Sequence, residues 1–157
     1  MADINRREFM AAAAVATAAC AMCAGHEAEA QTTAPAAGAT TVDVGAKTDY
    51  AADGMSDKFE TTNHIIVTRL SGQIFASSSK CTHQGVDVKI TGIQLICPKH
   101  HSIFQEDGSK APAPSGPAKT ALPRFAISVD ANGHLIVDMS QQFPQAKWTD
   151  PASFVTV

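Results

Sequence analysis

The sequence predicts an all-β domain of antiparallel strands, folded as a small β-sandwich or open barrel. Three observations support this prediction. Short runs rich in β-branched residues recur between residue 42 and the C-terminus. Gly-containing turn sequences separate these runs in pairs, as in β-hairpins. The same region shows no convincing spacing of an amphipathic helix.

The predicted strands follow one another as three hairpins. A Ser-Gly turn closes the first, a Thr-Gly turn the second, and an Asp-Ala-Asn-Gly turn the third. The expected strand pairs are 64–70 with 73–76, 88–90 with 93–96, and 125–129 with 134–137. His64 and His134 fall within these strand patterns, where we expect ordinary, partly exposed side chains.

Residues 1–30 are expected to be an export leader. Residues 5–10 (NRREFM) resemble a twin-arginine signal, an Ala-rich run follows at 11–25, and residues 28–30 (AEA) suit a signal-peptidase cut. We therefore expect a periplasmic protein. The alternative is that Arg6 and Arg7 are an ordinary positive n-region. The Ala-rich run is short and weakly apolar, so we expect no stable membrane span after cleavage.

The rest of the chain divides into a spacer and one domain. Residues 31–41 are small and polar, which is typical of a flexible spacer, and 42–157 form the domain. The formal net charge of −3 is too weak to predict nucleic acid or an anionic membrane as a partner. Of the four cysteines, only Cys81 and Cys97 lie beyond the leader, so we expect no disulfide.

Two short blocks each combine one cysteine with one histidine. Residues 81–83 read CTH and residues 97–100 read CPKH, with positions 84–96 between them. Two thiolates and two imidazoles can bind zinc or, when divided between two irons, hold a [2Fe–2S] centre. Zinc fingers usually group Cys with Cys and His with His, so the mixed order favours iron. A zinc-stabilised binding module is the alternative.

These blocks and their surroundings resemble the Rieske iron–sulfur family. Residues 81–85 (CTHQG) are similar to its first cluster loop, 97–102 (CPKHHS) to its second, and 114–118 (PSGPA) to its proline loop. The resemblance runs from about residue 50 to 139. It implies a Rieske-like antiparallel β-sandwich with a small cluster-binding lobe at about 80–118.

The resemblance also implies the ligands of one [2Fe–2S] cluster per chain. Cys81 and Cys97 are expected to bind one iron, and His83 and His100 the other. His101 is the alternative to His100, because it also follows Cys97 closely. The family spacing selects His100.

Further side chains are expected to tune the cluster. Ser102 is placed to donate a hydrogen bond to a sulfur, as its counterpart does in the family. Phe104 cannot donate where respiratory-complex members carry Tyr, and Val86 and Lys99 replace two cysteines that form a disulfide in those members. We expect a potential in the middle or lower part of the class window of roughly −150 to +300 mV. Where the family has Gly after the second histidine, this chain has His101. The spacer between the two loops is slightly shorter than in the family.

The resemblance implies one-electron transfer between a redox-protein donor and a redox-protein acceptor. At this length there is no room for the mononuclear-iron domain of Rieske oxygenases, so we expect no catalysis by the chain alone. We expect an exported soluble carrier, or the electron-transfer subunit of a periplasmic oxidoreductase such as the small subunit of arsenite oxidase. A Rieske subunit of a cytochrome bc-type complex is the alternative, although the missing disulfide and tyrosine disfavour it.

Overall fold

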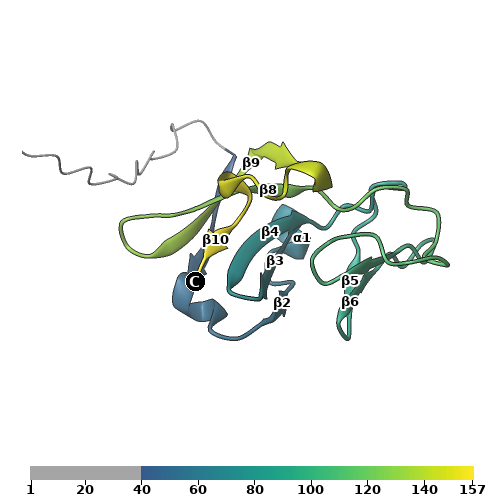
Figure 1. The fold of residues 1–157 in the computed structure, drawn as a ribbon, viewed down its shortest axis with the longest axis horizontal. Coiled ribbons are helices and arrows are strands. Elements are labelled where there is room, and N and C mark those ends of the chain that lie inside the picture. Colours follow the sequence, from purple (N-terminus) through teal and green to yellow (C-terminus); the bar gives the residue numbers. More distant parts are fainter. Residues whose placement is uncertain (1–39) are drawn as a thin grey trace, which may run out of the picture. The chain divides into compact units, whose positions relative to one another are not determined.

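The computed structural model describes residues 40–157, so the predicted leader and nearly all of the predicted spacer lie outside the described residues. This part of the chain contains ten strands: β1 Thr41–Ala46, β2 Gly54–Ser56, β3 Ile65–Leu70, β4 Gln73–Ser78, β5 Lys89–Thr91, β6 Gln94–Ile96, β7 Ile103–Gln105, β8 Arg124–Val129, β9 His134–Phe143 and β10 Val155–Thr156. They form two antiparallel sheets (Figure 1). The larger has the order β1-β9-β8-β4-β3-β2, with β10 paired to β4, and the smaller has the order β5-β6-β7. The predicted all-β class is confirmed.

The helical segments are short. They are the α-helix α1 Glu60–Asn63 and the 3₁₀ helices η1 Lys47–Tyr50, η2 Gln145–Lys147 and η3 Pro151–Ser153. Among residues 40–157, no helix has the length and apolar character needed to cross a bilayer.

All three predicted hairpins are present. β3 pairs with β4, β5 with β6, and β8 with β9, each antiparallel. Their turns hold Gly72, Gly92 and Gly133 at φ of 78°, 62° and 82°, where a residue with a Cβ is disfavoured. Turn chemistry and β-branched runs therefore account for this part of the fold.

Some boundaries differ from the prediction. His64 precedes β3 as the C-cap of α1, with φ 57°, so its predicted place within a strand is wrong, although its side chain is partly exposed as expected. Thr41 pairs with Asp138 and starts β1, one residue inside the predicted spacer. β9 continues to Phe143 because its second half keeps pairing with β8 past a bulge. β2 and β7 have three residues each, too few to show a period.

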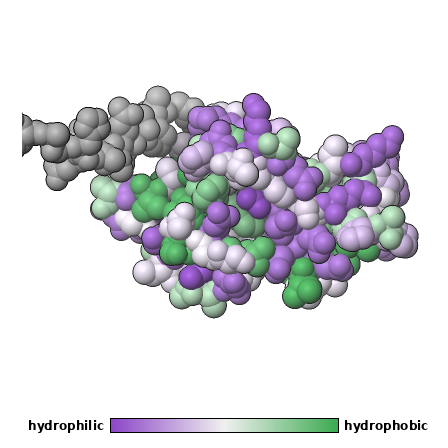
Figure 2. Space-filling model, in the orientation of Figure 1, coloured by the Kyte–Doolittle hydropathy of each residue, from purple (hydrophilic) through white to green (hydrophobic). Residues whose placement is uncertain are grey.

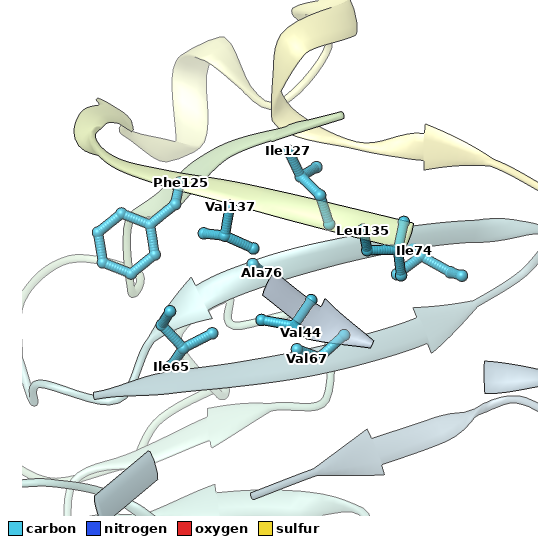
Figure 3. Close-up of a cluster of buried hydrophobic side chains, with 9 residues drawn as sticks. All are labelled: Val44, Ile65, Val67, Ile74, Ala76, Phe125, Ile127, Leu135 and Val137. Carbon is cyan, nitrogen blue, oxygen red and sulfur yellow. The ribbon is translucent and has the colours of Figure 1, made fainter. Parts of the chain in front are cut away.

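The main core is made of apolar side chains from the larger sheet. Figure 3 shows these side chains between the paired strands β3 and β4 and the paired strands β8 and β9. They are Val44, Ile65, Val67, Ile74, Ala76, Phe125, Ile127, Leu135 and Val137. Each of these four strands contributes two residues that are two positions apart, so one face of each strand is buried.

A second apolar cluster lies in the lobe that carries β5, β6 and β7. Its members are Ile66, Cys81, Val88, Leu95, Cys97, Phe104, Ala118 and Leu122. Ile66 of β3 faces this lobe, whereas its neighbours Ile65 and Val67 face the main core. One strand therefore supplies alternate side chains to both cores, and both cysteines belong to the interior of the lobe.

Arg124 fastens the C-terminal segment to the larger sheet. Its guanidinium carbon lies 3.6 Å from the ring centroid of Phe75 and 4.1 Å from that of Trp148, so the cation is stacked between two aromatic rings. Burial lowers the pKa of Arg124 to about 10. The segment that follows β9 is thereby held against the sheet.

Candidate metal centre

The first Cys-His block lies on a tight loop, residues 81–86. The N–H of Cys81 donates to the carbonyl of Val86 at 2.8 Å, and the N–H of Gly85 donates to the carbonyl of Cys81 at 2.7 Å. Gly85 takes φ 69°, which the chain needs in order to fold back. These two hydrogen bonds close a short turn, and this turn carries both Cys81 and His83.

The second block repeats this hydrogen-bond pattern in residues 97–102. The N–H of Cys97 donates to the carbonyl of Ser102 at 2.8 Å, and the N–H of His101 donates to the carbonyl of Cys97 at 3.0 Å. His101 takes φ 54° at the position that Gly85 occupies in the first loop. The unusual histidine therefore adopts the left-handed backbone that the family's glycine would supply.

The two loops bring the four predicted donors together in like pairs. Cys81 and Cys97 are both buried and free of disulfides, and the proximity of the Cys81 thiol helps to lower the pKa of Cys97. The ring centroids of His83 and His100 lie 4.8 Å apart, with the rings at 71° to each other. Across residues 40–157, no three His, Cys, Asp or Glu side chains converge as ligands of one ion. The arrangement is a sulfur pair beside a nitrogen pair.

The surroundings of Cys97 favour its thiolate. Burial opposes ionisation, but the backbone N–H groups of His100 and Lys99, the Cys81 thiol and the Lys99 charge outweigh it and lower the pKa of Cys97. A metal binds the thiolate and not the thiol. The loop therefore stabilises Cys97 as the thiolate, the form that binds a metal.

The surroundings of His100 favour its neutral form. Burial, followed by the proximity of His83, Lys99 and His101, lowers the pKa of His100. Its Nδ1 is buried and has no hydrogen-bond partner in the described part of the chain. A neutral imidazole with an unused buried nitrogen is what a metal site requires, so this residue fits an iron–sulfur centre.

The predicted proline loop packs directly on the second Cys-His loop. A Cβ at Gly116 would lie 2.5 Å from the carbonyl oxygen of His101 and 2.7 Å from the Cα of Ser102, so only glycine allows this approach. The carbonyl of Ser115 accepts a hydrogen bond from Ile103 N–H at 2.9 Å. The loop thereby shields the buried side of the second loop from water.

The predicted tuning residues lie in the interior of the lobe. Ser102 is fully buried, and its Oγ accepts a hydrogen bond from the backbone N–H of Ala118 at 3.0 Å. Phe104 is fully buried in the same apolar cluster as Cys81 and Cys97. His101 is exposed beside His100.

Asp87, which is not among the residues predicted for the site, holds the base of the first loop together. Asp87 Oδ1 accepts a hydrogen bond from Ser79 Oγ at 2.6 Å and lies 3.1 Å from His64 Nδ1, while Oδ2 accepts from Lys80 Nζ at 3.1 Å. The only signal in the sequence was the position of an acidic residue directly after a ligand loop. Its partners are identifiable only once the fold brings them together.

Comparisons with known proteins identify a family for this sequence. The sequence model of the Rieske [2Fe-2S] domain matches residues 40–126. Two curated relatives are cytochrome bc1 complex Rieske iron-sulfur subunits. The subunit of Corynebacterium efficiens is 39% identical over 70 residues, 43% of this chain and 17% of the relative. That of Corynebacterium glutamicum is 38% identical over 68 residues, 41% of this chain and 16% of the relative. The chain thus spans about a sixth of the length of these relatives.

Two solved structures share the likeness. The cyanobacterial plasma membrane Rieske protein PetC3 from Synechocystis PCC 6803 is 28% identical with a TM-score of 0.46, over 61% of this chain and 97% of that one. A chain in a complex of reduced oxygenase and oxidized ferredoxin in carbazole 1,9a-dioxygenase is 22% identical with a TM-score of 0.44, over 63% and 93%. Because the sequence match covers more than half of the chain, this protein belongs to the Rieske family, whose domain binds a [2Fe–2S] cluster.

Proposed function

We propose that Cys81 and Cys97 bind one iron of the cluster and that His83 and His100 bind the other. The observation that carries this assignment is the division of the four donors into a buried thiol pair and an adjacent imidazole pair. The unpartnered Nδ1 of His100 supports it further.

The bound cluster supplies one-electron chemistry. With neutral imidazoles the oxidised centre has no net charge, whereas four thiolates would make it a dianion, so histidine ligation raises its potential. The chain's own residues set the surroundings. The apolar cluster around the cysteines excludes water, and Ser102 has a hydroxyl proton available for a sulfur acceptor.

The protein transfers electrons between redox partners, and two contexts are supported by different observations. The export signal predicted at residues 5–10 favours a periplasmic carrier or oxidoreductase subunit. The named function of the two Corynebacterium relatives favours a cytochrome bc-type complex. Purification of the native complex, followed by identification of the subunits that copurify, distinguishes the two contexts.

Metal analysis tests the assignment of the ligands. We expect two irons and two acid-labile sulfides per chain, with an EPR signal of low average g after reduction. Cys81→Ser and Cys97→Ser should each abolish the cluster, and His101→Gln should retain it. A colourless, EPR-silent protein with one zinc would contradict the proposal, and loss of the cluster in His101→Gln would contradict the choice of His100.

Export is tested separately on the full chain. Replacement of Arg6 and Arg7 by Lys should leave the precursor in the cytoplasm, because the twin-arginine translocase reads the pair itself. If the variant still reaches the periplasm, the two arginines contribute only positive charge to the n-region.

A further inference from the structure

Three loops form what we call the cluster end of the molecule: residues 81–86, 97–102 and 112–120. Their exposed side chains include Lys99 and Lys119, together with His83 and His101. None of the three segments contains Asp or Glu. Figure 2 shows mainly hydrophilic surface at its right-hand side, beyond the β5–β6 hairpin that Figure 1 labels. The cluster end therefore carries positive charge without internal compensation.

This charge is local, because the described part of the chain is almost neutral. Residues 40–157 contain ten Lys and Arg against eleven Asp and Glu. Lys80 and Lys89, the lysines at the neck of the lobe, pair with Asp87 and Glu60. Within the described residues, no carboxylate lies in ion-pair contact with Lys99 or Lys119. Net charge alone would give this protein a slight preference for cations, whereas the cluster end has the opposite sign.

Lys99 is exposed and lies in the second cluster loop, directly before the proposed ligand His100. A partner that docks within contact distance of Lys99 is therefore also close to the imidazole pair.

An apolar hollow adjoins the same end. It has a volume of about 540 Å³ and lies between the first cluster loop and the segment that follows β9. Its apolar lining residues are Ala121, Pro123, Pro144 and Ala146, and Lys119 also lines it. An apolar depression beside uncompensated lysines is a suitable contact for a protein surface that is itself apolar with an acidic border.

We propose that the cluster end docks the acidic face of a redox-protein partner, with Lys99 and Lys119 as its electrostatic contacts. This inference rests on the proposed electron-transfer function and adds the charge of the partner. Exposed lysines steer a partner over a Debye length, which is about 30 Å at 0.01 M salt and about 8 Å at 0.15 M. The association rate should therefore depend strongly on salt.

Stopped-flow oxidation of the reduced, cluster-loaded full-length protein tests this. The two probes are plastocyanin, an acidic blue-copper protein, and mitochondrial cytochrome c, a basic haem protein. We expect the second-order rate constant with plastocyanin to fall about tenfold or more between 10 and 200 mM NaCl. With cytochrome c it should stay level or rise.

Variants locate the effect on the surface. Lys99→Gln and Lys119→Gln should each slow plastocyanin about two- to fourfold at 10 mM NaCl and flatten its salt dependence. Lys58→Gln, at an exposed lysine between β2 and α1, is the matched control and should change the rate by less than about 1.5-fold. Ala146→Glu adds a negative charge to the hollow without altering a cluster loop, and should slow plastocyanin as the lysine variants do. The variants are compared by how strongly their rate constants depend on salt. A change in the driving force for electron transfer would change the rate constant at every salt concentration, whereas loss of a docking charge changes its dependence on salt.

The outcomes separate this proposal from the function on which it rests. If ferricyanide oxidises the cluster by one electron per chain but plastocyanin shows no salt dependence, electron transfer stands and the docking surface is wrong. Equal effects of Lys58→Gln and Lys119→Gln would also overturn it, because they would show a response to net charge. Failure to transfer an electron even to ferricyanide contradicts the proposed function and, with it, the docking surface.

Discussion

The Oγ of Ser102 accepts a hydrogen bond from the backbone N–H of Ala118 at 3.0 Å, joining the second Cys-His loop to the end of the proline loop. Both residues are buried. Because the hydroxyl uses a lone pair in this contact, its proton remains available to a second acceptor. In the proposed site that acceptor is a cluster sulfur.

Ser102→Ala should lower the reduction potential. A hydrogen bond to a charged acceptor is worth roughly 1.5–3 kcal/mol, and the part that favours the more negative reduced state corresponds to a decrease of about 50–130 mV. The variant should also lose stability, because the buried N–H of Ala118 is left without its partner. Protein-film voltammetry measures the first effect and thermal unfolding the second.

Ser115→Ala is the matched control for this prediction. Ser115 is also a buried serine of the lobe, but its Oγ accepts a hydrogen bond from Lys110 Nζ at 2.8 Å. We expect a loss of stability with little change in potential. If Ser102→Ala and Ser115→Ala shift the potential equally, the effect comes from general loosening of the lobe and not from a bond to sulfur.

Phe104→Tyr should raise the reduction potential. The Phe104 ring is fully buried and packs in the apolar cluster that contains both cysteines, so a phenol there has sulfur acceptors among its neighbours. A new bond to sulfur would favour the reduced state by an amount comparable to that of Ser102, about 50–130 mV. Voltammetry at constant pH measures the shift. Lower unfolding free energy with an unchanged potential would mean that the new hydroxyl is buried without a sulfur partner.

Asp87→Ala should weaken the neck of the first loop. The expected loss of unfolding free energy is about 1–2 kcal/mol, mainly from the bond to Ser79, because Lys80 and His64 are partly exposed and their charges are screened. The cluster should also be lost faster on dilution into chelator, since the loop that carries Cys81 opens more often. Iron release followed by absorbance measures this rate. Asp57→Ala, an exposed carboxylate, should leave both quantities unchanged.

The hairpins could be predicted from the sequence, because the conformation of each turn depends on the few residues within it. Gly72, Gly92 and Gly133 mark the three hairpin turns because the left-handed backbone has few alternatives at those positions. The two short Cys-His loops are likewise visible in the sequence. The structure places the rings of His83 and His100 in contact and leaves both cysteines buried and free, and the assignment of the four residues as ligands stays a prediction.

Features that depend on distant partners were not predictable from the patterns. The contact of His64 with Asp87 exists only after β3 and the first loop meet, and the local pattern therefore predicts a strand residue at His64. The pairing of Thr41 with Asp138 likewise joins residues that are far apart in the sequence. The short strands β2 and β7 are formed by tertiary pairing and carry too few residues for a detectable period.

His134→Gln should reduce stability at mildly acidic pH and have no such effect at alkaline pH. His134 Nδ1 lies 2.8 Å from Asp43 Oδ2, and this carboxylate raises the pKa of His134 above 6.5. A raised pKa means that the stabilisation is complete below 6.5 and is lost as the pH rises through the folded-state value. The pKa of Asp43 is lowered below 3.8, first by the N–H of Gly45 and then by His134, so its contribution is lost as the pH falls through that lowered value. The pair therefore stabilises the fold between about pH 4 and 6.5.

Urea unfolding of the wild type and His134→Gln at pH 5.5 and pH 9 measures the difference. Both side chains are about half exposed, so solvent screens the pair and the effect should be small but confined to pH 5.5. Asp43→Asn should produce a loss at pH 5.5 that does not add to that of His134→Gln, because each variant removes the same charge pair. An equal loss at both pH values would mean that His134 stabilises the β1–β9 pairing through contacts that do not depend on its charge. In that case the pH dependence of stability must come from other groups.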